Sequence, residues 1–103
     1  MKTTTVQTLW DRRDRLGILA EILETAKGKQ GKTKIMYKVN LSFSQVNEYL
    51  SFLTEMGFIK IQKERGKKTY ETTSKGYSYI DKYVEMSQLL TAKELQVPMI
   101  PGY

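Results

Sequence analysis

Residues 32–60 read KTKIMYKVNLSFSQVNEYLSFLTEMGFIK, and they carry the clearest structural signal in the chain. Its apolar residues have helical spacing in two runs, which are Ile35, Met36 and Val39, then Phe43, Val46, Tyr49, Leu50 and Leu53. Thr33 and Ser42 can each cap the start of a helix, while Asn40 can end the first run. Gly57 suits the left-handed residue just past the end of the second run. The stretch therefore predicts two helices joined by a tight turn.

A further helix is expected before this block, over about 12–26. Its apolar residues are Leu16, Leu19, Ala20, Leu23 and Ala26, with Ile18 and Ile22 widening the same face. Asp11 is the predicted N-cap, and Gly17 predicts close packing by a neighbouring element. The lysine- and glycine-rich stretch 27–32 has no apolar residue to bury, so we expect a loop there.

A β-hairpin and a closing helix are expected after the block. Residues 58–63 alternate in polarity, 65–67 can turn, and 69–73 are rich in β-formers. Ser74 is the predicted cap of a helix from about Lys75 to at least Thr91. Four residues of this helix repeat at intervals of four, three and four, the spacing of a coiled-coil seam, which predicts a partner helix and hence a homodimer: Tyr79, Tyr83, Met86 and Leu90.

This order of elements is typical of a winged helix-turn-helix. We therefore predict an α+β, mostly α fold, with three helices, a β-hairpin wing and a C-terminal dimerisation helix. The expected divisions are a flexible arm over 1–10, the winged helix-turn-helix over 11–74, the dimerisation helix over 75–95 and a flexible tail over 96–103, where prolines end the helix.

The composition of the 103 residues narrows the possible chemistry. The chain has no Cys and no His, which excludes thiolate nucleophiles, histidine bases, Cys/His zinc sites and disulfides. We expect no enzyme activity, no cofactor and no metal site. The apolar runs are far shorter than the roughly 20 residues that cross a bilayer, and the start MKTTTVQTLWDRRDR lacks the apolar core of a signal peptide. A cytoplasmic protein without membrane contact is the expectation.

Positive charge is concentrated in particular segments. The formal net charge is +6, and 27–38 holds five lysines and no acid, while 60–68 holds five basic residues and one Glu. A smaller basic cluster lies at 12–15, whereas the closing helix over 75–94 is balanced. Such clusters favour a polyanionic partner if they converge on one face, although each alone is also compatible with a solvated surface.

In a winged helix-turn-helix, the helix over 42–56 enters the major groove of duplex DNA and the basic wing over 64–69 reaches the backbone or minor groove. The predicted base-reading residues are the polar ones on the outer face of that helix: Ser44, Gln45, Asn47, Glu48 and Ser51. The predicted phosphate-binding residues are the basic and capping residues around it: Arg12, Arg13, Lys32, Thr33, Lys34, Lys38, Ser42, Arg65, Lys67 and Lys68.

The sequence also resembles a known family, the small archaeal winged-helix proteins that bind DNA as dimers and include chromatin-associated proteins and transcription regulators. The resemblance covers about 11–92 and is carried by RRDRL at 12–16, KTKIMYK at 32–38, NLSF at 40–43, YL at 49–50, GFI at 57–59 and TSKG at 73–76. It implies a nucleoid-associated, double-stranded DNA-binding protein whose closing helix pairs with that of a second subunit.

Two other functions remain open from the residues alone. Many winged helices bind protein partners instead, through the third helix or the wing. Exposed tyrosines can stack on single-stranded bases, and Tyr37 and Tyr70 lie beside basic residues, although most tyrosines here have core spacing. A catalytic role has the least support, since only carboxylates, lysines and hydroxyls are present and no pocket is indicated.

Overall fold

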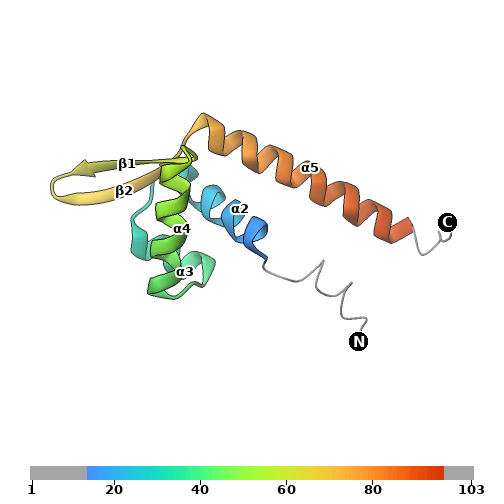
Figure 1. The fold of residues 1–103 in the computed structure, drawn as a ribbon, viewed down its shortest axis with the longest axis horizontal. Helices are drawn as coiled ribbons and strands as arrows, with labels where there is room; N and C mark the ends of the chain where they lie inside the picture. The colour runs from blue at the N-terminus through green and yellow to red at the C-terminus, as the bar shows by residue number, and fades with distance from the viewer. Residues whose placement is uncertain (1–13, 97–103) are drawn as a thin grey trace.

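A computed structural model describes residues 14–96, with side chains described as far as residue 89. The elements are α2 (Arg15–Thr25), a short 3-10 helix (Ala26–Gly28), α3 (Lys32–Val39), α4 (Phe43–Glu55), β1 (Ile59–Glu64), β2 (Lys67–Thr72) and α5 (Ser74–Gln96). Figure 1 shows α2, α3 and α4 gathered together, with the hairpin projecting to one side and α5 to the other. The predicted fold class is thereby confirmed. The predicted arm, Asp11, and the tail from residue 97 lie outside the described residues.

Within the described residues, α2 begins at Arg15, three positions later than predicted. Asp14 is its N-cap, with extended backbone and a carboxylate that accepts the N–H of Gly17 at 2.9 Å. Most of the predicted apolar face is buried, but Leu16 is 50% exposed because it lies in the first turn at the rim of a surface groove. Gly17 does mark close packing: a Cβ there would lie 3.0 Å from the hydroxyl of Tyr83 on α5.

The start of α3 also differs from the prediction, because Gly31 and not Thr33 is the N-cap. Gln30 exchanges two backbone hydrogen bonds with Tyr70 of β2, at 3.0 and 2.8 Å. This bridge fixes the chain just before Gly31, so the helix begins at Lys32 and Thr33 falls inside its first turn. The predicted end is confirmed, since Asn40 takes the left-handed conformation with φ of 60°.

The boundaries of α4 match the prediction closely. The Ser42 hydroxyl accepts the N–H of Gln45, and the Gln45 side chain accepts the N–H of Ser42, which completes a capping box. Gly57 has φ of 82° just past the C-cap. One inward residue was predicted wrongly, because Phe43 is 63% exposed. It stands at the first helical position and projects beyond the part of α4 that neighbouring helices cover.

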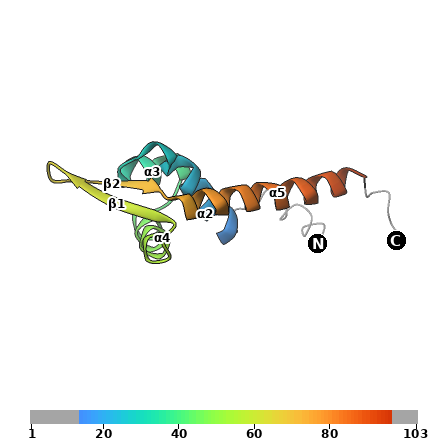
Figure 2. The same cartoon turned by 90° about the horizontal axis from the view of Figure 1, so that it is seen from above.

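The hairpin is a two-residue type in which Glu64 pairs with Lys67 across the turn. Arg65 and Gly66 both have positive φ, 52° and 80°, as a type I′ turn requires. Figure 2 shows that β1 and β2 extend well beyond the helices, with the turn at the far tip. The predicted wing is therefore confirmed, and its tip stands in solvent.

The closing helix α5 starts one residue earlier than predicted and runs through Gln96. The Thr73 hydroxyl accepts the N–H of Gly76, so Thr73 rather than Ser74 caps the helix. Gly76 packs directly against the carbonyl of Phe58 and the side chain of Thr72, and this contact sets where α5 meets the hairpin. Within the described range, no helix is both long and apolar enough to cross a membrane.

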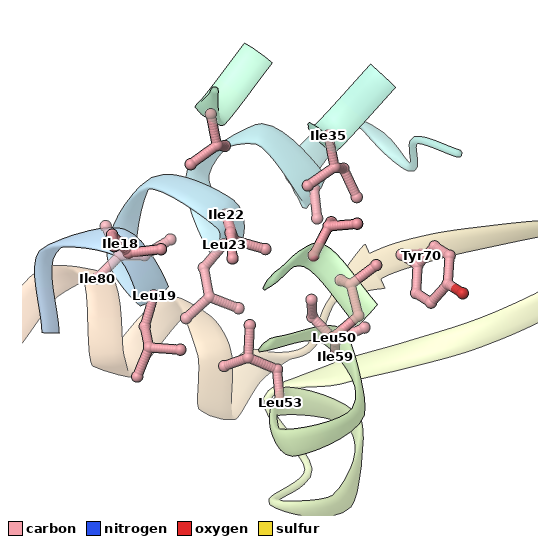
Figure 3. Packing of buried hydrophobic residues seen from close by; sticks show 13 residues of the cluster. Ile18, Leu19, Ile22, Leu23, Ile35, Leu50, Leu53, Ile59, Tyr70 and Ile80 are labelled. Atoms are coloured by element: carbon pink, nitrogen blue, oxygen red, sulfur yellow. The ribbon is translucent and has the colours of Figure 1, made fainter. Parts of the chain in front are cut away.

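The core lies where α2, α3, α4, the base of the hairpin and the start of α5 meet (Figure 3). Its largest fully buried side chains come from α2, α3 and α4, and they are Ile22, Leu23, Ile35, Leu53 and Val46. The buried Thr72 hydroxyl donates to the carbonyl of Leu23 at 2.6 Å, which joins β2 to α2 without an unpaired polar group. The core thus fixes α4 and the wing relative to each other.

Candidate nucleic-acid interface

The outer face of α4 is polar. Ser44, Glu48 and Ser51 are exposed, as predicted for base-reading residues. Gln45 is different, because its Oε1 is held by the Ser42 N–H within the capping box. A paired donor and acceptor contact from Gln45 to adenine would use both Oε1 and Nε2, so it would share Oε1 with the Ser42 N–H. Gln45 keeps its Nε2 group and the second lone pair of Oε1, and the capping box fixes the orientation of both.

Asn47 and Lys32 are joined directly, which the sequence spacing did not reveal. The Lys32 ammonium donates to Oδ1 of Asn47 at 2.6 Å and lies 5.3 Å from the centroid of the Phe43 ring. The start of α3 and the first turns of α4 therefore share one small cluster, Lys32, Phe43 and Asn47. The ammonium is held next to α4 instead of extending freely into solvent.

A groove of about 450 Å³ separates α4 from the wing. Lys32 and Asn47 line one side, and Lys68 and Tyr70 of β2 line the other, with Ser51 on α4 also at its wall. The two lysines come from the separate basic clusters that the sequence indicated. Glu55 of α4 also lines this groove, so its charged residues are two lysines and one carboxylate. The lining is therefore net positive, and such a groove attracts anions, which unrelated solvated lysines would not do.

The wing carries its charge at the tip. Lys63 lies opposite Lys68, and Glu64 opposite Lys67, next to the Arg65–Gly66 turn. Glu64 also lies 3.8 Å from Lys29 in the loop before α3, an exposed ion pair of small energetic value. Since these side chains are exposed, the tip presents Arg65, Lys67 and Lys68 to solvent.

The other predicted phosphate-binding residues fall into three groups. Thr33, Lys34 and Lys38 are exposed on α3. The N–H and hydroxyl of Ser42 are both used in the capping box, which leaves the hydroxyl proton as its available donor. Arg12 and Arg13 lie outside the described residues.

Two of the predicted dimerisation residues face the chain's own domain. The Tyr79 hydroxyl donates to the carbonyl of Leu16 at 2.7 Å, and its ring meets that of Phe58 edge-on at 5.5 Å. The Tyr83 ring stacks on Tyr79, with centroids 6.4 Å apart. Burial, with smaller contributions from Tyr83 and Asp14, raises the pKa of Tyr79 to about 12. This half of the predicted seam therefore packs against α2, because α5 crosses α2 before it leaves the domain.

The rest of the predicted seam lies beyond that contact. Met86 is 45% exposed, and the side chain of Leu90 lies outside the described part. Leu89, which was not predicted as a seam residue, is 63% exposed.

A second groove, of about 480 Å³, lies between α2 and α4 on a different side of α4. Leu16, Leu19, Tyr49 and Phe52 give it an apolar lining, with Arg15 and Glu48 at its edge. It was not predicted, because Leu16 and Tyr49 have the spacing of core residues. The available signal was that each lies near an end or flank of its helix's apolar face.

Known proteins share both the sequence pattern and the fold of this chain. The model of a winged helix-turn-helix family matches residues 12–91. The chain belongs to this family. An uncharacterized protein of Methanocaldococcus jannaschii is 34% identical over 83 residues, which are 80% of this chain and 81% of that protein. A second uncharacterized protein of the same archaeon is 36% identical over 80 residues, and the match covers 77% of this chain but 36% of that longer protein.

Solved structures share this winged helix-turn-helix fold. Sso10a-2, a DNA-binding protein from Sulfolobus solfataricus, has a TM-score of 0.69 and 26% identity, with 88% of this chain and 100% of that chain covered. The PcaV transcriptional regulator from Streptomyces coelicolor has a TM-score of 0.65 at 12% identity, covering 95% of this chain and 74% of that one, and so shares the fold alone. The predicted resemblance to archaeal winged-helix proteins is confirmed.

Proposed function

We propose that this winged helix-turn-helix protein binds double-stranded DNA and acts as a transcription regulator or chromatin-associated protein in the cytoplasm, at the nucleoid. The observation that carries the proposal is the groove between α4 and the wing, with Lys32 on one side and Lys68 on the other. In the family's fold, α4 occupies the major groove and the wing reaches the flanking backbone or minor groove. A phosphate strand then lies along the groove between them. The similarity to the DNA-binding protein Sso10a-2 supports the same assignment.

The two parts of the interface have separate roles in this proposal. Lys32, Lys34, Lys38 and the wing residues supply affinity through phosphates, which is independent of sequence. The polar residues on the outer side of α4 supply whatever base preference exists: Ser44, Gln45, Asn47, Glu48 and Ser51.

Charge reversal at the groove tests the proposal. Lys68→Glu should weaken binding to a mixed-sequence duplex at low salt by about tenfold, because it removes one phosphate contact and adds a repulsive charge. Lys60→Glu is the matched control, because Lys60 is exposed on β1 and points to the opposite face of the hairpin from Ile61, which lines the groove, and the net charge changes equally. Gel shifts measure both affinities. Equal weakening by the two variants, or no duplex binding by the unaltered protein, contradicts the proposal.

We also propose that the protein is a homodimer through the outer part of α5. The 23 residues of α5 span roughly 35 Å at about 1.5 Å per residue, which is more than α2 can cover. Met86 and Leu89 are exposed beyond the contact with α2, and they lie three residues apart on one face of the helix. A second copy of α5 would bury them.

A second candidate function is a protein-interaction module, and the apolar groove between α2 and α4 favours it. Reversing the charges of Lys32, Lys34, Lys67 and Lys68 distinguishes the two functions. Duplex binding should be lost, whereas a protein partner in the groove lined by Leu16 and Phe52 would still bind.

A further inference from the structure

Phe43 is the large apolar side chain that projects from the start of α4, the helix that the proposed function places in the major groove. It is 63% exposed, although its spacing had suggested a core position. Single exposed apolar residues are common in proteins and have no meaning alone. The position of Phe43 is informative, because its ring lies beside Lys32 at the edge of the candidate interface.

The ring of Phe43 faces the Lys32 ammonium, which comes from α3. The Lys32 ammonium lies 5.3 Å from its centroid, and the same ammonium donates to Asn47 at 2.6 Å. Asn47 is four residues along α4, so it and Phe43 lie on the same side of the helix. An apolar surface is thus presented beside a predicted base reader and a predicted phosphate ligand.

The major groove offers one apolar group to such a surface, which is the 5-methyl group of thymine. The other base edges there are hydrogen-bond donors and acceptors that a phenyl ring does not satisfy. We infer that Phe43 contacts thymine methyl groups and is a specificity-determining residue that favours A·T pairs beneath the first turn of α4. This inference rests on the proposed duplex binding and adds a base preference to it.

Replacing thymine by uracil removes the methyl group and keeps the Watson–Crick pair, so it tests this contact. One probe is a duplex of alternating adenine and thymine, and the other is the same duplex with every thymine replaced by uracil. The alternating sequence presents thymine methyl groups wherever α4 binds along the duplex. We expect the unaltered protein to bind the thymine duplex about fourfold more tightly for each methyl group that Phe43 covers. Burial of one methyl group strengthens a binding constant by about this factor.

Two variants decide the origin of any difference. Phe43→Ala should bind the two duplexes equally, and Phe43→Leu, which keeps an apolar side chain, should retain part of the preference. Phe52→Ala is the matched control: Phe52 is the same residue type on the same helix, and nine residues, or two and a half turns, place it on the opposite side. It should keep the full preference for thymine.

The outcomes separate the inference from the proposed function. Equal binding of both duplexes by the unaltered protein overturns the role of Phe43 but leaves duplex binding intact. A preference that persists in Phe43→Ala also overturns it, because the difference then arises from duplex flexibility. Failure of the unaltered protein to bind either duplex at low salt contradicts the proposed function itself.

Discussion

Tyr79 packs against its own domain, although its position on α5 has the spacing of a coiled-coil seam. Its hydroxyl donates to the carbonyl of Leu16 at 2.7 Å, and its ring packs against Phe58. Tyr79→Phe keeps the ring and removes the hydrogen bond, so we expect the free energy of unfolding to fall by about 1 kcal/mol near neutral pH. Thermal or urea unfolding measures the difference.

The raised pKa of Tyr79, about 12, makes this difference depend on pH. Below pH 10 the tyrosine is protonated in both the folded and unfolded states, so its full contribution is present. Above pH 10 the unfolded state ionises first and is favoured, so the contribution is lost as the pH rises toward 12. The stability difference between the protein and Tyr79→Phe should therefore be constant up to about pH 9.5 and shrink above it. A difference that grows with pH would contradict the burial of this hydroxyl.

Gly76 allows the start of α5 to pack closely against the base of the hairpin, because it lacks a Cβ. A Cβ at this position would meet the backbone carbonyl of Phe58, which cannot move without disturbing the base of β1. Gly76→Ala should thus destabilise the protein by roughly 1–3 kcal/mol, as overpacking does, despite the higher helix propensity of Ala. Gly17→Ala provides a comparison, because the nearest atoms there are side-chain oxygens of Asp14 and Tyr83, which can shift. Similar effects of both changes on the unfolding midpoint would contradict the close contact at Gly76.

Capping residues illustrate what the sequence can and cannot predict at this scale. Ser42 was identified correctly, since the capping box with Gln45 is local. The caps of α3 and α5 were each misplaced, because the bridge from Gln30 to Tyr70 and the contact of Gly76 with Phe58 join residues distant in sequence. A single sequence contains no direct signal for such contacts.

At the tip of the wing, the charge of Arg65 can be removed without disturbing the turn. Arg65 has φ of 52°, which Asn adopts more readily than Arg. Arg65→Asn should leave the unfolding free energy equal or slightly higher, yet weaken duplex binding and reduce the steepness of its salt dependence by about one unit of log–log slope. Gel shifts at several salt concentrations measure this slope. An unchanged slope would mean that Arg65 does not contact phosphate.

Hydrophobic periodicity predicted the helices and strands well. The helices, the hairpin and their order followed from local patterns of apolar and turn-forming residues. The convergence of Lys32 and Lys68 on one groove did not, because it depends on how α3 and β2 pack around α4. Phe43 was misassigned for a related reason: helical spacing gives the direction of a side chain, but not whether a neighbouring element reaches it.

The whole molecule has its wing and the end of α5 at opposite extremes, as both ribbon views show (Figures 1 and 2). A dimer through the outer part of α5 would therefore hold two winged domains apart, each with its wing pointing away from the shared helices. Such an arrangement suits two separated half-sites on one duplex.

Substitutions on α5 test this arrangement. Met86→Lys combined with Leu89→Lys should convert the dimer to a monomer in sedimentation experiments, because the charges would lie where the partner helix is expected. Val84→Lys is the control, since Val84 is as exposed as Met86 but lies on the opposite side of the helix, 200° away at about 100° per residue. A monomeric unaltered protein, or equal dissociation by both sets of changes, would contradict the proposed dimer.

The affinity for duplex DNA is expected to come from phosphates held by α3, the groove and the wing, so the binding constant should depend steeply on salt concentration. If about six phosphates are neutralised per site, the logarithm of the binding constant should fall linearly against the logarithm of salt concentration, with a slope of about −5. Lys68→Glu should make the slope shallower, and Lys60→Glu should leave it unchanged. A slope near zero for the unaltered protein would contradict the account.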